Sequence, residues 1–543
     1  MTNLEIAQKA KLRPIEDIAR AAKLSTEEFE PLGRYKGKLT DAGVKRLLTS
    51  EKRGKLILVT AINPTPAGEG KTTVSVGLAQ GLNRIGKSAI PALREPALGP
   101  VFGVKGGACG GGYSQVIPME DINLFFNGDM PAISAAHNLL AAMLDASLHA
   151  GNPLRIDTQK IWWPRSVDMI DRSRREIVVG LGEGNGPVRS DRFVITPASE
   201  VMASLCLARN RADLKQRLGR IVVALNEKGE PVRASDLGAQ GAMAALLKDA
   251  IRPNLVQTIE GGAALIHGGP FGNVAHGCSS VIGTQCGLRM ADFLVTEGGF
   301  GSDLGGEKFL NIVTRELGEH PDAIVLVATV RALRHHGDGD LLKGCANLGR
   351  HIRHLTRYGP PVVVAVNRFK DDDPEDLQTV VRYAQEKGIP AVVADPWNCG
   401  GPGCEELAEI VAEKAANASP YEWNYDLDDD IPTKLQKTVE KVYGGTGIVL
   451  SKSASNRIKW AEKNGFDKLP LCVAKTQYSL SDEARLLAAP EGFDLHVREV
   501  WISAGAGFIV AVCGEIMLMP GMGKAPAALN IDITDDGVIT GLN

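Results

Sequence analysis

The stretch Lys55 to Thr73, KLILVTAINPTPAGEGKTT, decides the fold of this 543-residue chain. Residues 55–62 are almost wholly apolar, which is typical of a strand buried on both faces of a parallel sheet. A turn rich in proline and glycine follows, and residues 72–84 then have the spacing of a helix. The stretch therefore predicts a strand, a tight loop and a helix, in that order.

Further short apolar runs lie at residues 87–93, 292–296, 323–329, 362–366 and 391–394. Longer helical segments separate them, so we predict an α/β fold, a P-loop NTPase-like core with a mostly parallel sheet and additional α/β subdomains. We assign residues 1–150 and 255–359 to the nucleotide-binding core, the Arg- and Asp-rich residues 151–254 to an inserted α/β subdomain, and residues 360–543 to a C-terminal α/β domain.

The loop between the first strand and its helix has the character of a phosphate-binding loop. Backbone N–H groups of such a loop, with the helix N-terminus behind them, form a cradle for anions. Lys71 would reach the outer phosphates and the Thr72 hydroxyl would reach Mg²⁺. The strict pattern begins with glycine, where this chain has Thr65. The predicted nucleotide-binding residues are Thr65, Pro66, Ala67, Gly68, Glu69, Gly70, Lys71 and Thr72.

The sequence favours ATP over GTP as the nucleotide. Guanine recognition needs an NKxD element, but Asn367 is followed three positions later by Lys370, not by aspartate. A partition-type ATPase switch commonly has a second lysine early in the loop, where this chain has Pro66.

Charged residues follow two other apolar runs. Arg94 and Glu95 follow the run at 87–93 and precede the glycine-rich run 104–113. An arginine at a strand's carboxyl end is well placed to bind a phosphate or a carboxylate through two parallel hydrogen bonds, although a surface ion pair with Glu95 is the alternative. Glu297 follows the run at 292–296 and could orient Mg²⁺, or could serve as a helix cap or a structural carboxylate.

Two of the few aromatic residues also follow strands. Phe369 comes after the run at 362–366, and Trp397 after the run at 391–394. Rings at the ends of successive strands could stack on both faces of a flat heterocycle. Two ordinary core aromatics are the alternative.

Composition excludes several classes of protein. Lys and Arg number 61 and Asp and Glu number 64, for a net charge of −3, so nothing supports a nucleic-acid or membrane-surface protein. The nine cysteines lack a paired spacing, which indicates reduced thiols and a cytoplasmic protein. Residues 1–14 lack the apolar core of a secretory signal, and residues 503–522 are interrupted by Glu515 and Pro520, which favours buried strand and loop over a membrane span.

Several long segments together resemble the formate–tetrahydrofolate ligase (10-formyltetrahydrofolate synthetase) family. They are TPAGEGKTT at 65–73, REPALGPVFGVKGGACGGGYSQVIPMEDINL at 94–124, AHNLLAAM at 136–143, EGGFGSDLGGEKF at 297–309 and VNRF at 366–369. The resemblance implies ligation of formate to N10 of tetrahydrofolate, with ATP converted to ADP and phosphate through a formyl phosphate intermediate.

The resemblance also implies roles for particular residues. Lys71 and Arg94 would be catalytic and would hold the γ-phosphate and then formyl phosphate. The substrate-binding residues would be Arg94, Glu95, Asp129, Phe369 and Trp397. Of these, Phe369 and Trp397 would stack on the pterin, and the C-terminal domain would contribute the folate site. Mg²⁺ would be held by Thr72 and Glu297. Further expectations are a homotetramer, stimulation by K⁺ or NH₄⁺, and no nucleic-acid or membrane partner.

The chain departs from the family pattern at two places. Phe125 and Pro131 stand where histidines are common, close to Asp129, and the chain ends in Leu542-Asn543. Two other hypotheses compete with the ligase. One is an ATP-driven switch, which would hydrolyse ATP without formate and tetrahydrofolate; the other is a related ligase that acts on a different acid.

Overall fold

The computed structural model describes residues 1–103, 107, 109–417 and 419–542. Residues 104–106 and 108 of the glycine-rich run, and Asn543 at the chain end, lie outside the described residues.

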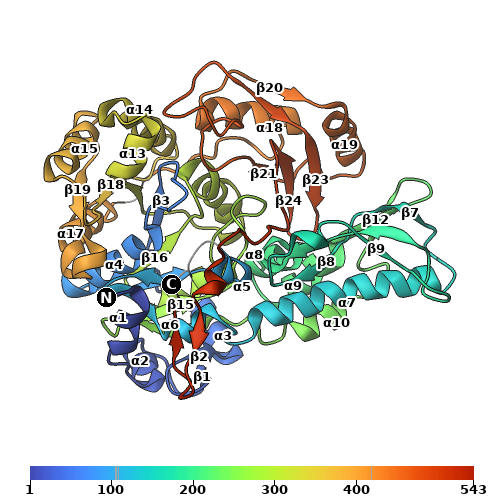
Figure 1. Ribbon diagram of the computed structural model, residues 1–543, viewed down its shortest axis with the longest axis horizontal. Coiled ribbons are helices and arrows are strands. Elements are labelled where there is room, and N and C mark those ends of the chain that lie inside the picture. Colours follow the sequence, from blue (N-terminus) through green and yellow to red (C-terminus); the bar gives the residue numbers. More distant parts are fainter. Residues whose placement is uncertain (104–106, 108, 418, 543) are drawn as a thin grey trace.

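The core is a twelve-stranded sheet with strand order β1-β2-β14-β15-β4-β16-β3-β17-β18-β19; β6 pairs with β14, and β5 pairs with β6 (Figure 1). From β15 to β19 the neighbouring strands are parallel, and from β1 to β15 they are antiparallel. The strands are β1 (Phe29–Pro31), β2 (Gly37–Leu39), β3 (Lys55–Ala61), β4 (Ala89–Leu93), β5 (Gly110–Gly111), β6 (Ser114–Ile117), β14 (Asn254–Thr258), β15 (Ala263–Ile266), β16 (Phe293–Glu297), β17 (Ala323–Ala328), β18 (Val362–Asn367) and β19 (Ala391–Ala394).

Alternate residues of the parallel strands enter two apolar clusters, one on each face of the sheet. Ile57 and Val59 of β3 pack with α4 (Lys71–Arg84) and α17 (Glu405–Lys414). Leu56 and Leu58 belong to the cluster on the opposite face, with α11 (Val281–Met290), α13 (Val330–His336) and α14 (Leu341–Thr356). Successive side chains of a strand point to opposite faces, so burial on both faces requires an unbroken apolar run.

These observations confirm the predicted α/β class with a large, mostly parallel sheet. The predicted run at 391–394 is β19, and the predicted helix at 72–84 is α4, which begins one residue earlier at Lys71. All parallel strands end at one edge of the sheet, which is where α/β proteins bind ligands.

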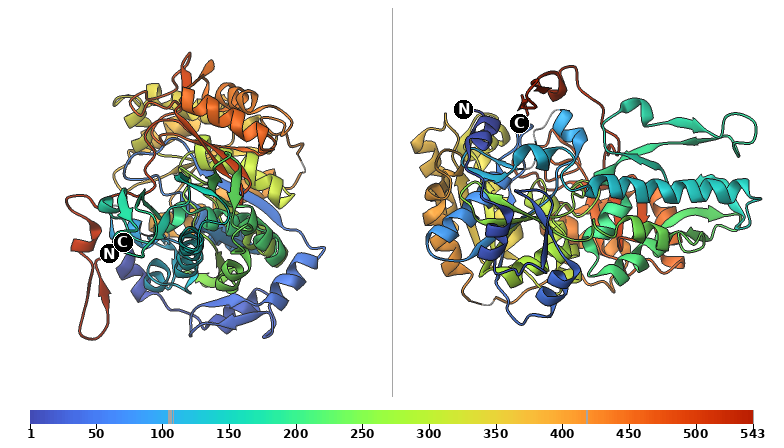
Figure 2. Two further views of the ribbon diagram at one scale, coloured as in Figure 1. Left: turned by 90° about the vertical axis from the view of Figure 1, so that its right-hand side faces the viewer. Right: turned by 90° about the horizontal axis from the view of Figure 1, so that it is seen from below.

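A second lobe is built on the long helix α7 (Asp129–His149), which runs along one side of the molecule (Figure 1). Short strands and helices pack beside it: β7 (Ile156–Ile161), β8 (Arg165–Val167), β9 (Ile177–Val179), β10 (Arg189–Asp191), β11 (Phe193–Ile195), α8 (Glu200–Leu207), α9 (Arg211–Arg220), β12 (Val222–Asn226), β13 (Pro231–Arg233) and α10 (Gln240–Leu246). In Figure 2 this lobe projects away from the central sheet.

The C-terminal residues form a third apolar cluster beside the carboxyl edge of the sheet. Its elements are α18 (Ile431–Thr438), β20 (Gly447–Leu450), α19 (Lys452–Lys463), β21 (Leu471–Ala474), β22 (Asp494–Val497), β23 (Glu499–Ser503) and β24 (Phe508–Val512). The division at residues 150, 254 and 359 stays a proposal; β18 and β19 lie in the central sheet next to β17. Among the described residues, none of the helices is both long and apolar enough to cross a membrane.

The last segment, residues 514–542, leaves this cluster and returns to the N-terminus; we call it the C-terminal strap. It contains β25 (Asp532–Ile533) and β26 (Ile539–Thr540), and it ends with Leu542 buried against α1 (Asn3–Lys9). Gln8 of α1 donates a hydrogen bond to the Ile539 carbonyl at 3.0 Å. The two ends of the chain therefore lie side by side in all views (Figure 2).

Candidate active site

A cavity at the carboxyl edge of the sheet surrounds the loop at residues 64–70. Its volume is about 530 Å³, and its wall includes residues 64–73, Arg94, Glu95 and Glu297. Helix α4 begins at this loop with Gly70 as its N-cap, and Gly70 has no side chain that could cap the helix. The first N–H groups of a helix have no partners within the helix and carry partial positive charge, so a helix N-terminus in a cavity wall suits an anion such as phosphate.

Glu69 holds the loop in shape. Its side chain is only 1% exposed and its Oε1 accepts hydrogen bonds from the Thr65 backbone N–H at 2.6 Å and from the Thr65 hydroxyl at 2.9 Å. The Thr329 hydroxyl donates to the other oxygen. Both carboxylate oxygens of Glu69 accept hydrogen bonds from within the protein. Glu69 can therefore contribute to nucleotide binding by fixing the conformation of the loop, without facing a phosphate itself.

Gly70 has the backbone angle that a sharp strand-to-helix turn requires. Its φ is +72°, and a Cβ built there would lie 2.5 Å from Asn367 Nδ2. That amide donates to the Glu69 carbonyl at 3.0 Å. Asn367, the residue considered for guanine recognition, therefore supports the loop from the end of β18.

Three predicted residues converge beside the loop. The Thr72 hydroxyl donates to Glu297 Oε2 at 2.9 Å, and Arg94 Nη2 lies 3.8 Å from Glu297 Oε1. Arg94 Nη1 donates to the Pro270 carbonyl at 3.2 Å, while its buried Nε has no hydrogen-bond partner among the described residues. The guanidinium thus retains hydrogen-bonding capacity, and Lys71 lines the same cavity.

Glu95 lies in the wall next to Arg94 but is 4% exposed, and its Oε2 has no partner within the described part of the chain. Burial, and secondarily the charge of Asp129, raise the pKa of the Glu95 carboxyl well above its ordinary value. The uncharged form is therefore favoured, and it does not repel an anion in the cavity.

Asp129 is not part of the cavity wall that the described residues form. It begins α7, where its Oδ1 lies 2.7 Å from Lys38 Nζ and its Oδ2 accepts a hydrogen bond from Asn254 at 2.8 Å. Both Lys38 and Asp129 are buried. Asp129 thus joins the second lobe to the antiparallel end of the sheet.

Phe369 and Trp397 follow neighbouring parallel strands, as predicted, but neither is among the described residues that line the cavity. Arg331 lies 4.4 Å from the Phe369 ring centre and also donates to the Gly68 carbonyl of the loop. The Trp397 indole N–H donates to Asn3 Oδ1 at 3.2 Å. Trp397 is 39% exposed and contacts Gly111, so it lies beside the glycine-rich run.

Other wall residues were missed by the sequence analysis. The C-terminal cluster contributes Gln477 and Tyr478, and the C-terminal strap contributes Pro520 and Gly521. No local motif marks these residues, because only the fold brings them to a loop more than 400 positions earlier in the chain.

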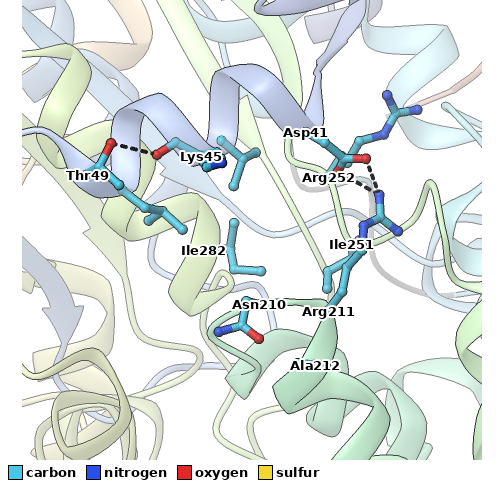
Figure 3. A pocket seen from close by; sticks show the side chains of 11 residues that line it. Asp41, Lys45, Thr49, Asn210, Arg211, Ala212, Ile251, Arg252 and Ile282 are labelled. Atoms are coloured by element: carbon cyan, nitrogen blue, oxygen red, sulfur yellow. Dashed lines mark hydrogen bonds and ion pairs between the residues drawn. The ribbon is translucent and has the colours of Figure 1, made fainter.

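A second cavity of about 470 Å³ lies between α3 (Asp41–Thr49), the start of α9, and α11 (Figure 3). Its wall is mainly aliphatic, with Val44, Leu48, Ile251 and Ile282. The ion pair at its rim is self-contained, since Arg211 donates to both Asp41 oxygens at 2.6 and 2.9 Å. Among the described residues of this wall there is no glycine-containing strand-to-helix turn of the kind that lines the first cavity.

The fold and the first cavity define an α/β protein in which an arginine and a hydroxyl–carboxylate pair lie beside a glycine-containing loop. Comparison with known proteins identifies the family within this class. The profile of the formate–tetrahydrofolate ligase family matches residues 1–543. A protein of Symbiobacterium thermophilum named formate–tetrahydrofolate ligase is 52% identical over 555 residues, covering 100% of both chains. This chain belongs to the formate–tetrahydrofolate ligase family.

Proposed function

We propose that ATP, formate and tetrahydrofolate react in the cavity around residues 64–73, with Lys71 and Arg94 as its catalytic residues. The family carries out the ATP-dependent ligation of formate to tetrahydrofolate, which gives 10-formyltetrahydrofolate. One observation supports the placement above all: Thr72, Arg94 and Glu297 meet beside the N-terminus of α4.

The chemistry needs positive charge at this point. Formate is a poor electrophile, because its carbon belongs to an anionic carboxylate. One formate oxygen attacks the γ-phosphorus of ATP, ADP leaves, and formyl phosphate forms. N10 of tetrahydrofolate then attacks the formyl carbon, loses its proton, and displaces phosphate. Lys71 and Arg94 would neutralise the charge on the transferred group in both steps.

Thr72 and Glu297 would hold Mg²⁺ together with the nucleotide phosphates. Their hydroxyl and carboxylate oxygens are already in contact at 2.9 Å, and oxygen donors of this kind suit Mg²⁺, which takes one or two protein ligands beside phosphates. Within the described part of the chain, no group of three or more His, Cys, Asp or Glu side chains could hold a metal on its own. When bound, the ion supplies charge for phosphoryl transfer.

Phe369 and Trp397 would receive the pterin. Arg331 covers one face of the Phe369 ring, so the pterin would stack on the opposite face and against Trp397. Glu95 would contact substrate from the cavity wall. Asp129 would act indirectly, through its charge on Glu95 and through its ion pair with Lys38.

The remaining family expectations stay proposals: a homotetramer, stimulation by K⁺ or NH₄⁺, and a cytoplasmic location. Light scattering on the purified protein tests the first. Activity in tetramethylammonium buffer, with K⁺ or NH₄⁺ added back, tests the second.

The decisive experiment uses formate labelled with ¹⁸O. If formate is phosphorylated first, one labelled oxygen must leave with the phosphate, because the formyl carbon keeps only one of the two formate oxygens. We expect labelled phosphate, and unlabelled phosphate would overturn the formyl phosphate route. Omission of each substrate in turn is the companion measurement: ADP release without formate or tetrahydrofolate would support an ATPase instead.

A further inference from the structure

Asn63 lies directly before the loop at residues 64–70 and is completely buried. It follows β3, and its neighbour Pro64 is the first residue of the cavity wall. Asn63 itself is not among the described residues that line the cavity, so the proposed chemistry gives it no part. Each of its polar atoms nevertheless has a partner, and these partners come from separate segments of the chain.

The side-chain amide of Asn63 joins the loop to the C-terminal cluster. Its Nδ2 donates to both oxygens of Asp303, at 3.1 and 3.2 Å, and to the Gln477 carbonyl at 3.3 Å. Asp303 Oδ2 in turn lies 2.6 Å from Lys475 Nζ, and neither of these two side chains is exposed. Because Gln477 and Tyr478 line the cavity, the amide connects two parts of the cavity wall.

The remaining polar atoms of Asn63 bind the helices α13 and α14. The Asn347 amide donates to Asn63 Oδ1 at 2.9 Å, and His336 Nε2 donates to the Asn63 carbonyl at 3.0 Å. His351 Nε2 lies 3.1 Å from the Asn63 backbone nitrogen and 2.9 Å from its Oδ1. The residue in front of the loop is therefore held from several sides at once.

We propose that Asn63 is a positioning residue for the ligation. It fixes the loop against residues 475–479, so that the loop and the C-terminal part of the cavity wall keep one relative position during phosphoryl transfer. Buried polar networks with all partners in place make the parts that they join rigid. A displacement of about 1 Å at a reacting group can cost about 100-fold in rate. The inference rests on the proposed function, which places the reaction at this loop.

Asn63→Ala is the variant that tests this role. It removes the amide and leaves no buried charge unpaired, because Asp303 keeps its ion pair with Lys475. The backbone contacts of residue 63 with His336 and His351 also remain. Loss of either charged partner would instead leave its mate buried alone, and the variant would lose its fold for that reason.

A second variant and a control accompany it. Asn347→Ala is milder, since Asn347 contacts Asn63 from α14 and is not among the described residues of the cavity wall. Asn311→Ala is the matched control. Asn311 is also a completely buried asparagine, with hydrogen bonds to Glu307 and to the Tyr358 hydroxyl, and it too is outside the described cavity wall.

Kinetics are measured well below the Tm of the least stable variant. Asn63→Ala should lower kcat about 10- to 100-fold and raise the KM for ATP, because the displaced loop no longer aligns the transferred group. The KM for tetrahydrofolate should change by less than about twofold. The reason is that Phe369 and Trp397 are held by other elements.

The other variants separate positioning from stability. Asn347→Ala should show the same pattern to a smaller extent. The double variant should be no worse than Asn63→Ala alone, because both residues act through one contact. Asn311→Ala should lower the Tm and leave kcat and every KM unchanged.

Wild-type kinetics in Asn63→Ala, with only a lower Tm, would overturn the inference, because Asn63 would then serve stability alone. An equal rise in KM for all three substrates, or an equal loss of kcat in Asn311→Ala, would overturn it as well. If Asn63→Ala does not fold, Asn347→Ala decides, and wild-type kinetics there count against the proposal. The proposed function is judged separately: an active Lys71→Ala refutes the site, whereas an inactive Lys71→Ala with a kinetically normal Asn63→Ala refutes only the positioning role.

Discussion

Arg94 lies between two acceptors of different kinds and keeps one unused donor. One N–H donates to a carbonyl, another faces Glu297 at 3.8 Å, and Nε has no partner within the described residues. The guanidinium is planar and has unused donors, so it can hydrogen-bond the phosphoryl group before and after its transfer from ATP to formate without a backbone movement.

Arg94→Lys keeps the charge and loses the fork of donors. We expect kcat to fall about 100-fold or more, while the KM for ATP changes by less than about threefold, because the lost hydrogen bonds form mainly in the transition state. Steady-state kinetics with ATP and formate varied separately checks this. Equal, mild effects on both parameters would indicate that Arg94 is only a partner of an acidic neighbour.

Lys71→Ala removes the lysine next to the N-terminus of α4. We expect at least about a 100-fold loss of kcat with an unchanged Tm, since the residue lies in the cavity wall. Lys463→Ala, an exposed lysine on α19, is the matched control. A variant that unfolds, or that keeps near-full turnover, would contradict the assignment.

At the scale of elements, the pairing of neighbouring strands determines how close together the residues that follow them lie. β18 and β19 are parallel neighbours, with Asn367 opposite Ala394 in the register, so the residues that follow them emerge side by side. Asn3 of α1 fixes the Trp397 indole, and Arg331 after β17 fixes the Phe369 ring. Each ring is thus held by an element other than its own strand.

Trp397→Ala should weaken tetrahydrofolate binding by about tenfold, because stacking on two faces contributes about 0.5–1.5 kcal/mol for each contact. ATP affinity should stay within about twofold. Stability should also hold, since Trp397 is 39% exposed and its truncation leaves no large buried void. Trp423→Ala, with 41% exposure and no part in the cavity wall, is the matched control. Separate titrations with ATP and with tetrahydrofolate measure the two affinities, and thermal melting measures the stability of each variant.

Periodicity predicts these elements well and their contacts poorly. The predicted apolar runs correspond to β3, β4, β16, β17, β18 and β19, because burial on both faces leaves an unbroken apolar signal. The predicted runs do not include β15, which pairs parallel with β4. The antiparallel end of the sheet and the ion pair of Lys38 with Asp129 leave no such signal in the sequence, since each depends on a partner far away along the chain. The inward-facing Glu69 likewise looks from sequence like any loop carboxylate, and only its bonds to Thr65 and Thr329 distinguish it.

On the scale of the whole molecule, buried polar residues join the sheet to the C-terminal cluster. Glu307 is 1% exposed and accepts a hydrogen bond from Asn311 at 2.8 Å, and Asn311 in turn accepts one from the Asn424 backbone at 3.2 Å. Burial raises the pKa of Glu307 to about 7. Its folded-state pKa is therefore above the ordinary value, so its contribution to stability is present at low pH and is lost as pH rises through about 7.

Glu307→Gln should remove this pH dependence. We expect the Tm of the variant to rise relative to the wild type between about pH 5 and about pH 8, by an amount that corresponds to roughly 2–3 kcal/mol at most. Glu462→Gln on the exposed face of α19 is the control, and its Tm should follow the wild type. Thermal scans across this range check the difference, and a constant offset between variant and wild type would contradict it.

The C-terminal strap has a consequence for how the protein is made. A ribosome that has passed residue 500 has already translated the phosphate loop, Arg94 and Glu297, but not Pro520 and Gly521, which complete the cavity wall, nor Leu542, which packs on the first helix. A nascent chain can therefore fold its central sheet early and still lack a finished site. The cavity wall is complete only when the C-terminal strap is in place, so the site depends on residues that are synthesised long after the phosphate loop.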